Sequence, residues 1–239
     1  MRNLFIIITT LIALTSCDLV DFDVDYGEFP ECEMQLDRHQ VYVMVGDTFT
    51  INPIFTPDTL PNREMFYYSE PEGLLQFDSE RFKAVKAGNT WLYGISVTQR
   101  LKDSCQVSVM EPWTVDADKD YPYDMVFYTQ VKLATSGLDF EPENMLVGAF
   151  VDGECRGLGV MRSAHGIDYL ELRVGSEVGY MAGDPEYDEE DGEPVEYMQE
   201  RVVIKVFDRK RHQVYTYKRS FDFDGETHGT LSDLLVLQF

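Results

Sequence analysis

The stretch Phe82-Lys-Ala-Val-Lys-Ala-Gly-Asn-Thr-Trp-Leu-Tyr-Gly-Ile-Ser-Val97 decides the fold of the first half of the chain. A short strand over residues 82–85 is followed by a turn at Gly88 and by a longer alternating stretch from Thr90 to Val97. Alternation with a period of two is typical of a β-strand that is buried on one face. Glycine permits the tight turn because it has no Cβ. The stretch therefore predicts two neighbouring strands.

The alternation in the longer strand also predicts which side chains face outward. Thr90 and Leu92 share one face of the strand, whereas Trp91 and Tyr93 share the opposite face. If the face that carries Leu92 is inward, Trp91 and Tyr93 lie on the surface of the sheet.

Further short strands surround this stretch between residues 32 and 111. Regular spacing of strands by turn residues, with no helical period, is typical of an all-β sandwich. With the two strands above they make about seven, the number in an immunoglobulin-like sandwich. The further strands are predicted at Val41–Val45, Thr48–Ile54, Met65–Ser69, Leu74–Phe77 and Gln106–Val109.

Four segments of this region resemble the bacterial immunoglobulin-like domain, group 2. They are Val-Gly-Asp-Thr-Phe at 45–49, Tyr-Tyr-Ser at 67–69, Phe-Lys-Ala-Val-Lys-Ala-Gly-Asn-Thr at 82–90 and Cys-Gln-Val-Ser-Val at 105–109. The resemblance implies a spacer or adhesive module without an active site.

A second all-β domain is predicted over residues 120–239, after a linker at 112–119. Pro112 cannot extend a central strand, and the aspartates that follow break the strand period. Asp152-Gly153 between two apolar strands is a hairpin signal, because both central residues of a type I′ turn need positive φ. The sequence thus predicts two β-sandwich domains in tandem. The strands of the second are predicted at Asp124–Leu133, Met145–Val151, Glu154–Met161, Tyr169–Val174, Glu200–Phe207, His212–Tyr217 and Leu234–Phe239.

The second domain resembles a β-sandwich module of secreted and surface proteins of Bacteroidetes. The matching segments are residues 147–157, 121–125 and 204–208. The resemblance implies a fold and a compartment and leaves the ligand open.

The N-terminus carries an export signal and a candidate lipid anchor. Arg2 precedes an apolar run from Leu4 to Leu14 that is too short to span a bilayer. Leu14-Thr-Ser-Cys17 resembles a bacterial lipoprotein lipobox, which implies removal of residues 1–16 and lipidation of Cys17. An ordinary secretory peptide with an incidental cysteine is the alternative. We expect an outer-membrane, lipid-anchored protein at the cell surface, on an acidic tether at 17–31 that resembles a surface-sorting signal.

The acidic composition limits the partners of the protein. The formal net charge is −23, with 44% hydrophobic residues, which describes a globular chain with an acidic surface. Nucleic acid is excluded as a partner by this charge, and an anionic membrane would repel the folded body. Attachment to a membrane is therefore expected through lipidated Cys17 alone.

Three cysteines remain after Cys17, so at least one of them is unpaired. Cys32 and Cys105 lie near the first and last strands of the first domain, and they are a candidate disulfide. Their pairing cannot be read from the sequence. Cys155, within a hairpin strand, is expected to be a small buried hydrophobic residue.

No catalytic, cofactor or metal site is predicted. The four histidines have no metal-ligating spacing, and nucleophile-elbow and phosphate-binding motifs are absent from the sequence. Glu154 and Arg156 share a strand face and predict an ion pair. The acidic stretch 182–195 is either a solvated insertion or a cation-binding loop, and both alternatives stay open.

Five aromatic residues are candidates for a ligand platform or for the interface between the domains. They are Trp91, Tyr93, Trp113, Tyr121 and Tyr123. Sugar rings stack on flat aromatic faces, but aromatic residues also fill domain contacts. We expect Trp91 and Trp113 to share one domain contact.

The predicted function is a non-catalytic adhesion or assembly module at the cell surface, with a protein or a glycan as partner. The alternative is a glycan-binding surface lipoprotein of a polysaccharide-uptake system. The two differ in whether the soluble part of the chain binds saccharides.

Overall fold

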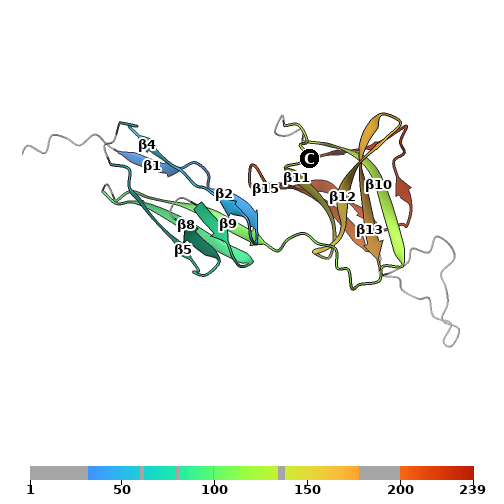
Figure 1. Cartoon of the computed structure of the whole chain (residues 1–239), viewed down its shortest axis with the longest axis horizontal. Coiled ribbons are helices and arrows are strands. Elements are labelled where there is room, and N and C mark those ends of the chain that lie inside the picture. Colours follow the sequence, from blue (N-terminus) through green and yellow to red (C-terminus); the bar gives the residue numbers. More distant parts are fainter. Residues whose placement is uncertain (1–31, 60–61, 79–80, 99, 134–137, 178–199) are drawn as a thin grey trace, which may run out of the picture.

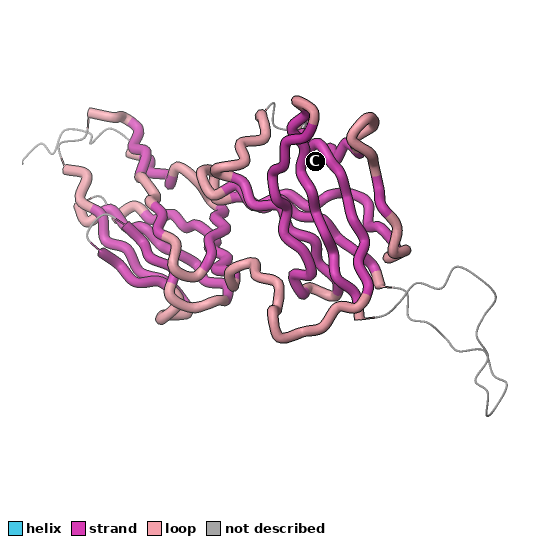
Figure 2. The backbone as a smooth tube through the Cα atoms, turned by 45° about the vertical axis from the view of Figure 1, so that its right-hand side comes forward, coloured by secondary structure: helices cyan, strands magenta, loops and turns pink. Residues whose placement is uncertain are grey.

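The computed structural model describes residues 32–59, 62–78, 81–98, 100–133, 138–177 and 200–239. The described residues contain strands, turns and loops but no helix, so none of them forms a helix that could cross a membrane. The strands form two β-sandwich domains in tandem, as the sequence predicts (Figures 1 and 2). The predicted signal peptide, Cys17, the tether and the acidic stretch 182–195 lie outside the described residues.

The first domain has the strand order of an immunoglobulin-like sandwich. One sheet has the order β2-β9-β8-β5 and the facing one β3-β7-β6. Within them β9-β8-β5 corresponds to strands G-F-C and β3-β7-β6 to strands B-E-D of the immunoglobulin fold. The strands are β2 (Gln40–Met44), β3 (Thr48–Phe49), β5 (Met65–Glu70), β6 (Leu75–Asp78), β7 (Arg81–Ala84), β8 (Gly88–Ser96) and β9 (Lys102–Met110).

The chain enters this domain by a strand that changes sheets. β1 (Glu33–Leu36) pairs antiparallel with β4 (Pro53–Thr56), and β2 then pairs parallel with β9. The sequence did not predict β1, because its four residues follow directly on an acidic stretch and alternate only twice.

Burial in β8 confirms the predicted alternation. Thr90 and Leu92 are buried against the core, whereas Trp91 is 45% exposed and Tyr93 is partly exposed. At the start of this strand Gly88 has a φ of 145°, and a Cβ there would lie 2.7 Å from Leu74 Cδ2. The backbone conformation therefore favours glycine, and a Cβ would also require the end of the Leu74 side chain to shift.

The second domain is built from one long chain of strands that folds into two layers. The order is β15-β14-β11-β12-β13-β10-β16, and β17 also pairs with β10. The first half of β12 pairs with β11 and the second half with β13, so β12 belongs to both layers. The strands are β10 (Tyr123–Lys132), β11 (Met145–Val151), β12 (Glu154–Ala164), β13 (Ile167–Ser176), β14 (Arg201–Asp208), β15 (Gln213–Asp222), β16 (Thr227–His228) and β17 (Leu235–Gln238).

A separate core fills this sandwich, with Phe127, Leu172, Ile204 and Leu237 fully buried. The turn between β11 and β12 has positive φ at Asp152 (50°) and at Gly153 (86°), which confirms the predicted hairpin. The sequence did not predict β16, which has only two residues.

Candidate functional site: the aromatic face of the first domain

Exposed and partly exposed aromatic side chains lie side by side on the outer surface of the β5-β8-β9 sheet. We call Phe66, Tyr68, Trp91, Tyr93 and the adjacent Lys102 the aromatic face. Tyr68 is paired with Tyr93, and Glu70 with Trp91, across β5 and β8. The opposite faces of these strands point inward, since Ser69 and Leu92 are buried.

The rings of the two tyrosines of the aromatic face, Tyr68 and Tyr93, stack on each other. Their ring centroids are 4.9 Å apart with an interplanar angle of 22°, and Phe66 lies 6.2 Å from Tyr68. Lys102 Nζ lies 4.1 Å from the centroid of Tyr93 and donates a hydrogen bond of 2.8 Å to the Tyr68 hydroxyl. This hydrogen bond raises the pKa of Lys102, so the ammonium group stays charged at the edge of the aromatic face.

Trp91 and Phe66 are the members of the aromatic face that are open to a partner. Phe66 is 58% exposed, and no ring of a described residue packs against the Trp91 indole. Glu70 and Gln106 flank Trp91 on the neighbouring strands. An aromatic surface next to carboxylate and amide groups can stack on a partner and also hydrogen-bond to it.

Trp113, by contrast, is covered by the second domain. It is 9% exposed and lies in a cluster with Met44, Phe150, Cys155 and Phe207, which we call the junction cluster. Its ring centroid is 5.0 Å from that of Phe150 at an angle of 78°. Trp113 is thus a domain-interface residue, and the prediction that Trp91 shares its contact is wrong.

Backbone and histidine contacts extend the junction on the side of β2. The Tyr42 N–H donates to the carbonyl oxygen of His212 at 2.8 Å, and the rings of His212 and Phe49 are 6.0 Å apart. His212 has a φ of 56°, in the turn between β14 and β15. Its Nδ1 is buried and has no hydrogen-bond partner among the described residues. Burial, followed by the charge of Arg38, lowers its pKa.

Tyr121 and Tyr123 belong neither to the aromatic face nor to the junction cluster. Tyr121 donates a hydrogen bond of 3.1 Å to Glu154 Oε1, and the Arg156 guanidinium carbon lies 4.8 Å from its ring centroid. Arg156 Nε contacts Glu154 Oε2 at 2.8 Å, which confirms the predicted ion pair. Tyr123 is 48% exposed on β10.

The salt bridge of Lys119 completes this polar group. Lys119 Nζ lies 2.8 Å from Glu154 Oε1, and this bond is the main cause of the lowered pKa of Glu154. The carboxylate is therefore ionised and shared by Lys119, Tyr121 and Arg156, which is a structural arrangement rather than that of a general acid.

The candidate disulfide between Cys32 and Cys105 is not formed, because Cys105 is a free, buried thiol. The Leu36 N–H donates to Asp103 Oδ2 at 2.7 Å and the Gln106 N–H to the His39 carbonyl at 2.9 Å, so the entering chain runs parallel to β9. Cys32 directly precedes β1, which pairs with β4 rather than with β9.

Cys105 lies instead in the hydrophobic core of the first domain. Burial raises the pKa of Cys105 to about 12, which leaves it an inert thiol. Cys155 is 8% exposed in the junction cluster, as expected of a small buried hydrophobic residue.

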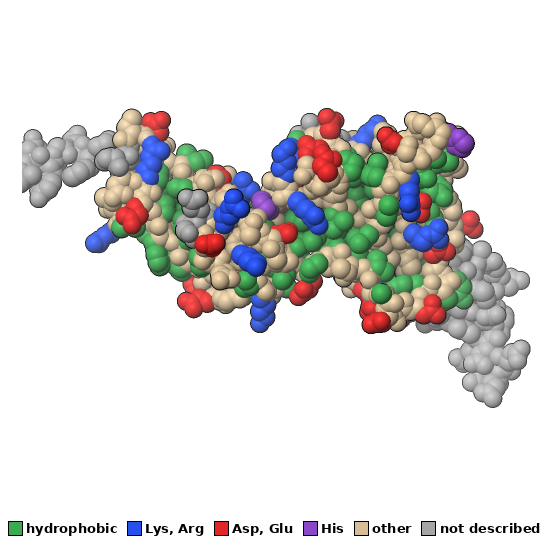
Figure 3. Space-filling model, viewed as in Figure 1, with side chains coloured by type: hydrophobic (Ala, Val, Ile, Leu, Met, Phe, Trp, Pro, Cys, Tyr) green, Lys and Arg blue, Asp and Glu red, His purple; other side chains and the backbone are tan. Residues whose placement is uncertain are grey.

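The described residues contain no group of three or more His, Cys, Asp or Glu side chains that could hold a metal ion. His39 instead lies 3.0 Å from Asp103 Oδ2, and His228 lies 3.0 Å from Asp224 Oδ2. Acidic and basic side chains are interspersed over both domains on the face shown in Figure 3.

Sequence reasoning identified Trp91 and Tyr93 but missed their partners on β5 and β9. The signal was present, because Met65, Tyr67 and Ser69 alternate with Phe66 and Tyr68. Each set contains a tyrosine and a second hydrophobic residue, so hydrophobicity does not indicate which set faces outward.

No family model and no curated protein matches the chain. The resemblances to the group 2 immunoglobulin-like domain and to the Bacteroidetes module stay predictions, although the β-sandwich folds that they imply are present. Among solved structures the chain is similar to PcdhgB3 EC1-4, at 11% identity and a TM-score of 0.29 over 87% of this chain and 50% of that one. The chain thus spans about half the length of that structure.

It is also similar to the fibronectin(III)-like modules of Clostridium thermocellum CbhA. That likeness has 11% identity and a TM-score of 0.28, and it covers 86% of this chain and 94% of the other.

Proposed function

We propose that this protein is a lipid-anchored, non-catalytic adhesion or assembly module of the cell envelope, and that the aromatic face is its contact surface. The observation that carries the proposal is the row of exposed aromatic side chains on a regular sheet. Protein interfaces are enriched in aromatic residues, and a few such residues supply most of the binding energy. Trp91 and Phe66 are the expected anchors, because their side chains are 45% and 58% exposed.

The pose of the two domains supports this proposal. The junction cluster brings together Trp113 of the connecting segment, Met44 of the first domain and Phe207 of the second. A packed junction restricts domain motion, so the aromatic face is presented in a fixed direction and binding costs less ordering entropy.

The membrane anchor is the second part of the proposal. Cys17 would carry the lipid, and more than one acyl chain gives durable attachment. Changing Cys17→Ala should move the protein from the outer-membrane fraction to the soluble fraction. Continued membrane association of this variant would contradict the anchor. If the wild-type protein on intact cells is not labelled by a reagent that cannot cross the membrane, it is not exposed at the cell surface.

A glycan-binding role in polysaccharide uptake is the second candidate, favoured by the surroundings of Trp91. Its indole is open, and Glu70 and Gln106 flank it on both neighbouring strands. A sugar ring could stack on the indole while its hydroxyls bond to these groups.

A glycan array probed with the soluble chain of residues 18–239 distinguishes the two candidates. Saccharide binding that is lost in Trp91→Ala supports the glycan role. If no saccharide on the array is bound, and the labelled chain binds intact cells in a way that depends on Trp91, the result supports protein adhesion.

Tyr123→Ala is the matched control for both assays, because Tyr123 is a similarly exposed aromatic residue (48%) on the second domain. We expect at least a tenfold loss of binding for Trp91→Ala and less than a twofold loss for Tyr123→Ala. Equal effects of the two variants would show that the aromatic face is not the contact surface.

A further inference from the structure

Two neighbouring strands of the second domain separate at one end of their sheet. β10 and β13 are paired from Tyr123↔Ser176 to Thr129↔Leu170. Beyond this last pair β10 continues to Lys132, and β13 begins three residues earlier at Ile167, but the two segments are not paired with each other. The sheet is therefore split at this end.

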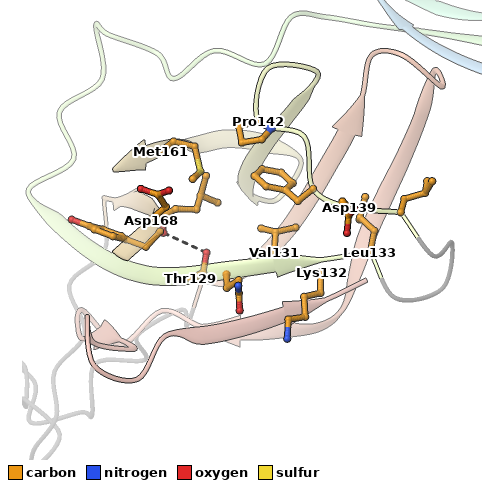
Figure 4. A pocket seen from close by; sticks show the side chains of 13 residues that line it. Thr129, Val131, Lys132, Leu133, Asp139, Pro142, Met161 and Asp168 are labelled. Carbon is orange, nitrogen blue, oxygen red and sulfur yellow. Dashed lines mark hydrogen bonds between the residues drawn. The ribbon is translucent and has the colours of Figure 1, made fainter. Parts of the chain in front are cut away.

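A cavity of about 640 Å³ lies at the split (Figure 4). It is lined by β10 from Thr129 onward, by Met161 of β12 and by the start of β13 at Asp168 and Tyr169. Leu133, Leu138, Asp139, Phe140 and Pro142, which come after β10 in the chain, complete the lining. Figure 4 shows Met161 and Asp168 on one side of the cavity and Asp139 on the other, with Val131 between them on β10.

The backbone of β10 turns unpaired groups toward this cavity. The Val126 N–H donates to the Glu226 carbonyl at 3.1 Å, and the Lys132 carbonyl accepts from the Phe239 N–H at 2.9 Å. These two residues therefore point their backbone groups toward β16 and β17. Successive residues of a strand point them to opposite sides, so Val131 points its N–H and C=O toward the split.

Among the described residues Val131 is not paired with β13, whereas Leu133, two residues further along the same edge of β10, forms an isolated bridge with Leu138. By the same alternation Asp168, two residues before the paired Leu170, points its backbone groups into the split from the opposite side. One position of each strand, Val131 of β10 and Asp168 of β13, thus faces the cavity without a partner on the other strand, and unpaired strand edges are templates for an added strand.

The side chains around the cavity indicate what the added strand would carry. Met161 is 40% exposed, and with Phe140 and Pro142 it supplies an apolar wall. Asp139 and Asp168 are both exposed and supply negative charge at the rim, and Lys132, also exposed, is the one basic residue among those that line the cavity. An apolar residue of a partner fits the wall, and a neighbouring Lys or Arg fits the rim.

We propose that this split binds an extended peptide segment of a partner protein, which adds as a strand beside β10. Backbone hydrogen bonds to Val131 and Asp168 would supply affinity, and an apolar residue next to a Lys or Arg would supply specificity. The site lies on the second domain, so the proposal does not depend on the aromatic face.

The test is selection of peptides from a phage-displayed library of random dodecapeptides on the soluble chain of residues 18–239. We expect enriched peptides that alternate apolar and polar residues and contain Lys or Arg. N-methylation of alternate peptide amides should weaken binding at least tenfold for one of the two alternating sets, because it removes the donors that face the strand edge. An insensitive peptide, or a selection without enriched sequences, would overturn the proposal.

Two variants with the same chemical change locate the binding. Met161→Asp places a charge on the apolar wall, whereas Val160→Asp places it on the opposite face of the same strand, where Val160 is 46% exposed and does not line the cavity. We expect at least a tenfold loss of peptide affinity for Met161→Asp and less than a twofold loss for Val160→Asp. Equal losses would contradict the site.

Asp168→Lys provides an independent measurement, because it changes an exposed residue and should not affect folding. It should weaken the Lys- or Arg-containing peptides severalfold at low salt, and the loss should shrink as the salt concentration rises. Peptides that lose binding in Trp91→Ala rather than in these variants would assign the peptide to the aromatic face and would refute the split as their site.

Discussion

The aromatic face and the junction cluster are both built around a tryptophan, but one tryptophan is exposed to solvent and the other is buried. Each contains one of the two tryptophans of the chain. Trp91 in the middle of β8 is 45% exposed, whereas Trp113, three residues after β9, is 9% exposed. The difference is the second domain, whose Phe150 and Phe207 cover only Trp113.

This contrast has an energetic consequence. Burial of one large aromatic side chain removes about 150–250 Å² from water, worth about 4–6 kcal/mol as an upper estimate before ordering costs. Trp113 contributes this to domain docking, whereas Trp91 keeps its surface for a partner. Substitution of Trp113 should therefore mainly lower stability, whereas substitution of Trp91 should mainly weaken binding.

The largest effect on stability is expected for Trp113→Ala. The variant leaves a cavity between Phe150 and Met44, which should cost about 3–5 kcal/mol of unfolding free energy. Urea unfolding should then change from one transition to two, as the domains lose their coupling. A single transition at the wild-type midpoint would contradict the role of the junction cluster.

Gly148→Ala should disturb the same cluster from the side of β11. A Cβ at this position would lie 2.9 Å from Phe150 Cε2 and 3.0 Å from Trp113 Cε3, so the rings must shift. We expect a loss of about 1–3 kcal/mol, measured by urea unfolding. Gly153→Ala, in the exposed hairpin turn, has no atom within 4 Å of its Cβ and should leave the Trp113 emission unchanged.

A smaller effect is expected from acidification, through His212 at the edge of the junction. Its pKa is lowered by burial and by Arg38, while Asp47 and Asp208 oppose the shift. The unfolded state therefore binds the proton more readily, so this contribution to stability is complete above the ordinary pKa of about 6.5. The contribution is lost as the pH falls from about 6.5 through the lowered pKa of the folded state. Below that pH, His212 causes no further change in stability.

The measurement is the urea midpoint between pH 7.5 and pH 5, compared between wild type and His212→Asn. Asparagine tolerates the positive φ of 56° and does not titrate. The wild-type protein should lose more stability on acidification than the variant does. An identical pH dependence of both proteins would show that His212 is not the titrating group.

The smallest stability change is expected for Trp91→Ala, which should lower the unfolding free energy by less than about 1 kcal/mol, because the side chain is half exposed. Thermal unfolding of the variant should overlay that of the wild type, so that its binding defect is not a folding defect. A large loss would mean that Trp91 is a packing residue, and the aromatic face would lose its main anchor.

Most of the fold could be predicted, because its signals are local. The alternation at 90–97 gives β8 and its outward face, and Asp152-Gly153 gives the β11-β12 hairpin. β1 and β16 could not be predicted, since they are short and are fixed by pairing with β4 and β10. The division of β12 between two sheets is likewise a tertiary property.

The candidate site could be predicted only in part. Alternation places Trp91 and Tyr93 outward, but it does not show that the second domain covers Trp113 instead of Trp91. The covering side chains, Phe150 and Phe207, lie in strands whose hydrophobic residues fit the core of the second domain equally well. The contact between two domains depends on how they are placed in space, and the hydrophobic periodicity of a sequence contains no information on that placement.

Acrylamide quenching of two single-tryptophan variants tests the central contrast most directly. Acrylamide is neutral, so the net charge of −23 does not repel it. Trp91→Phe leaves Trp113, which should emit at shorter wavelength and be quenched weakly. Trp113→Phe leaves Trp91, which should emit at longer wavelength and be quenched strongly. Equal quenching of the two tryptophans, or stronger quenching of Trp113, would contradict an open aromatic face beside a sealed domain junction.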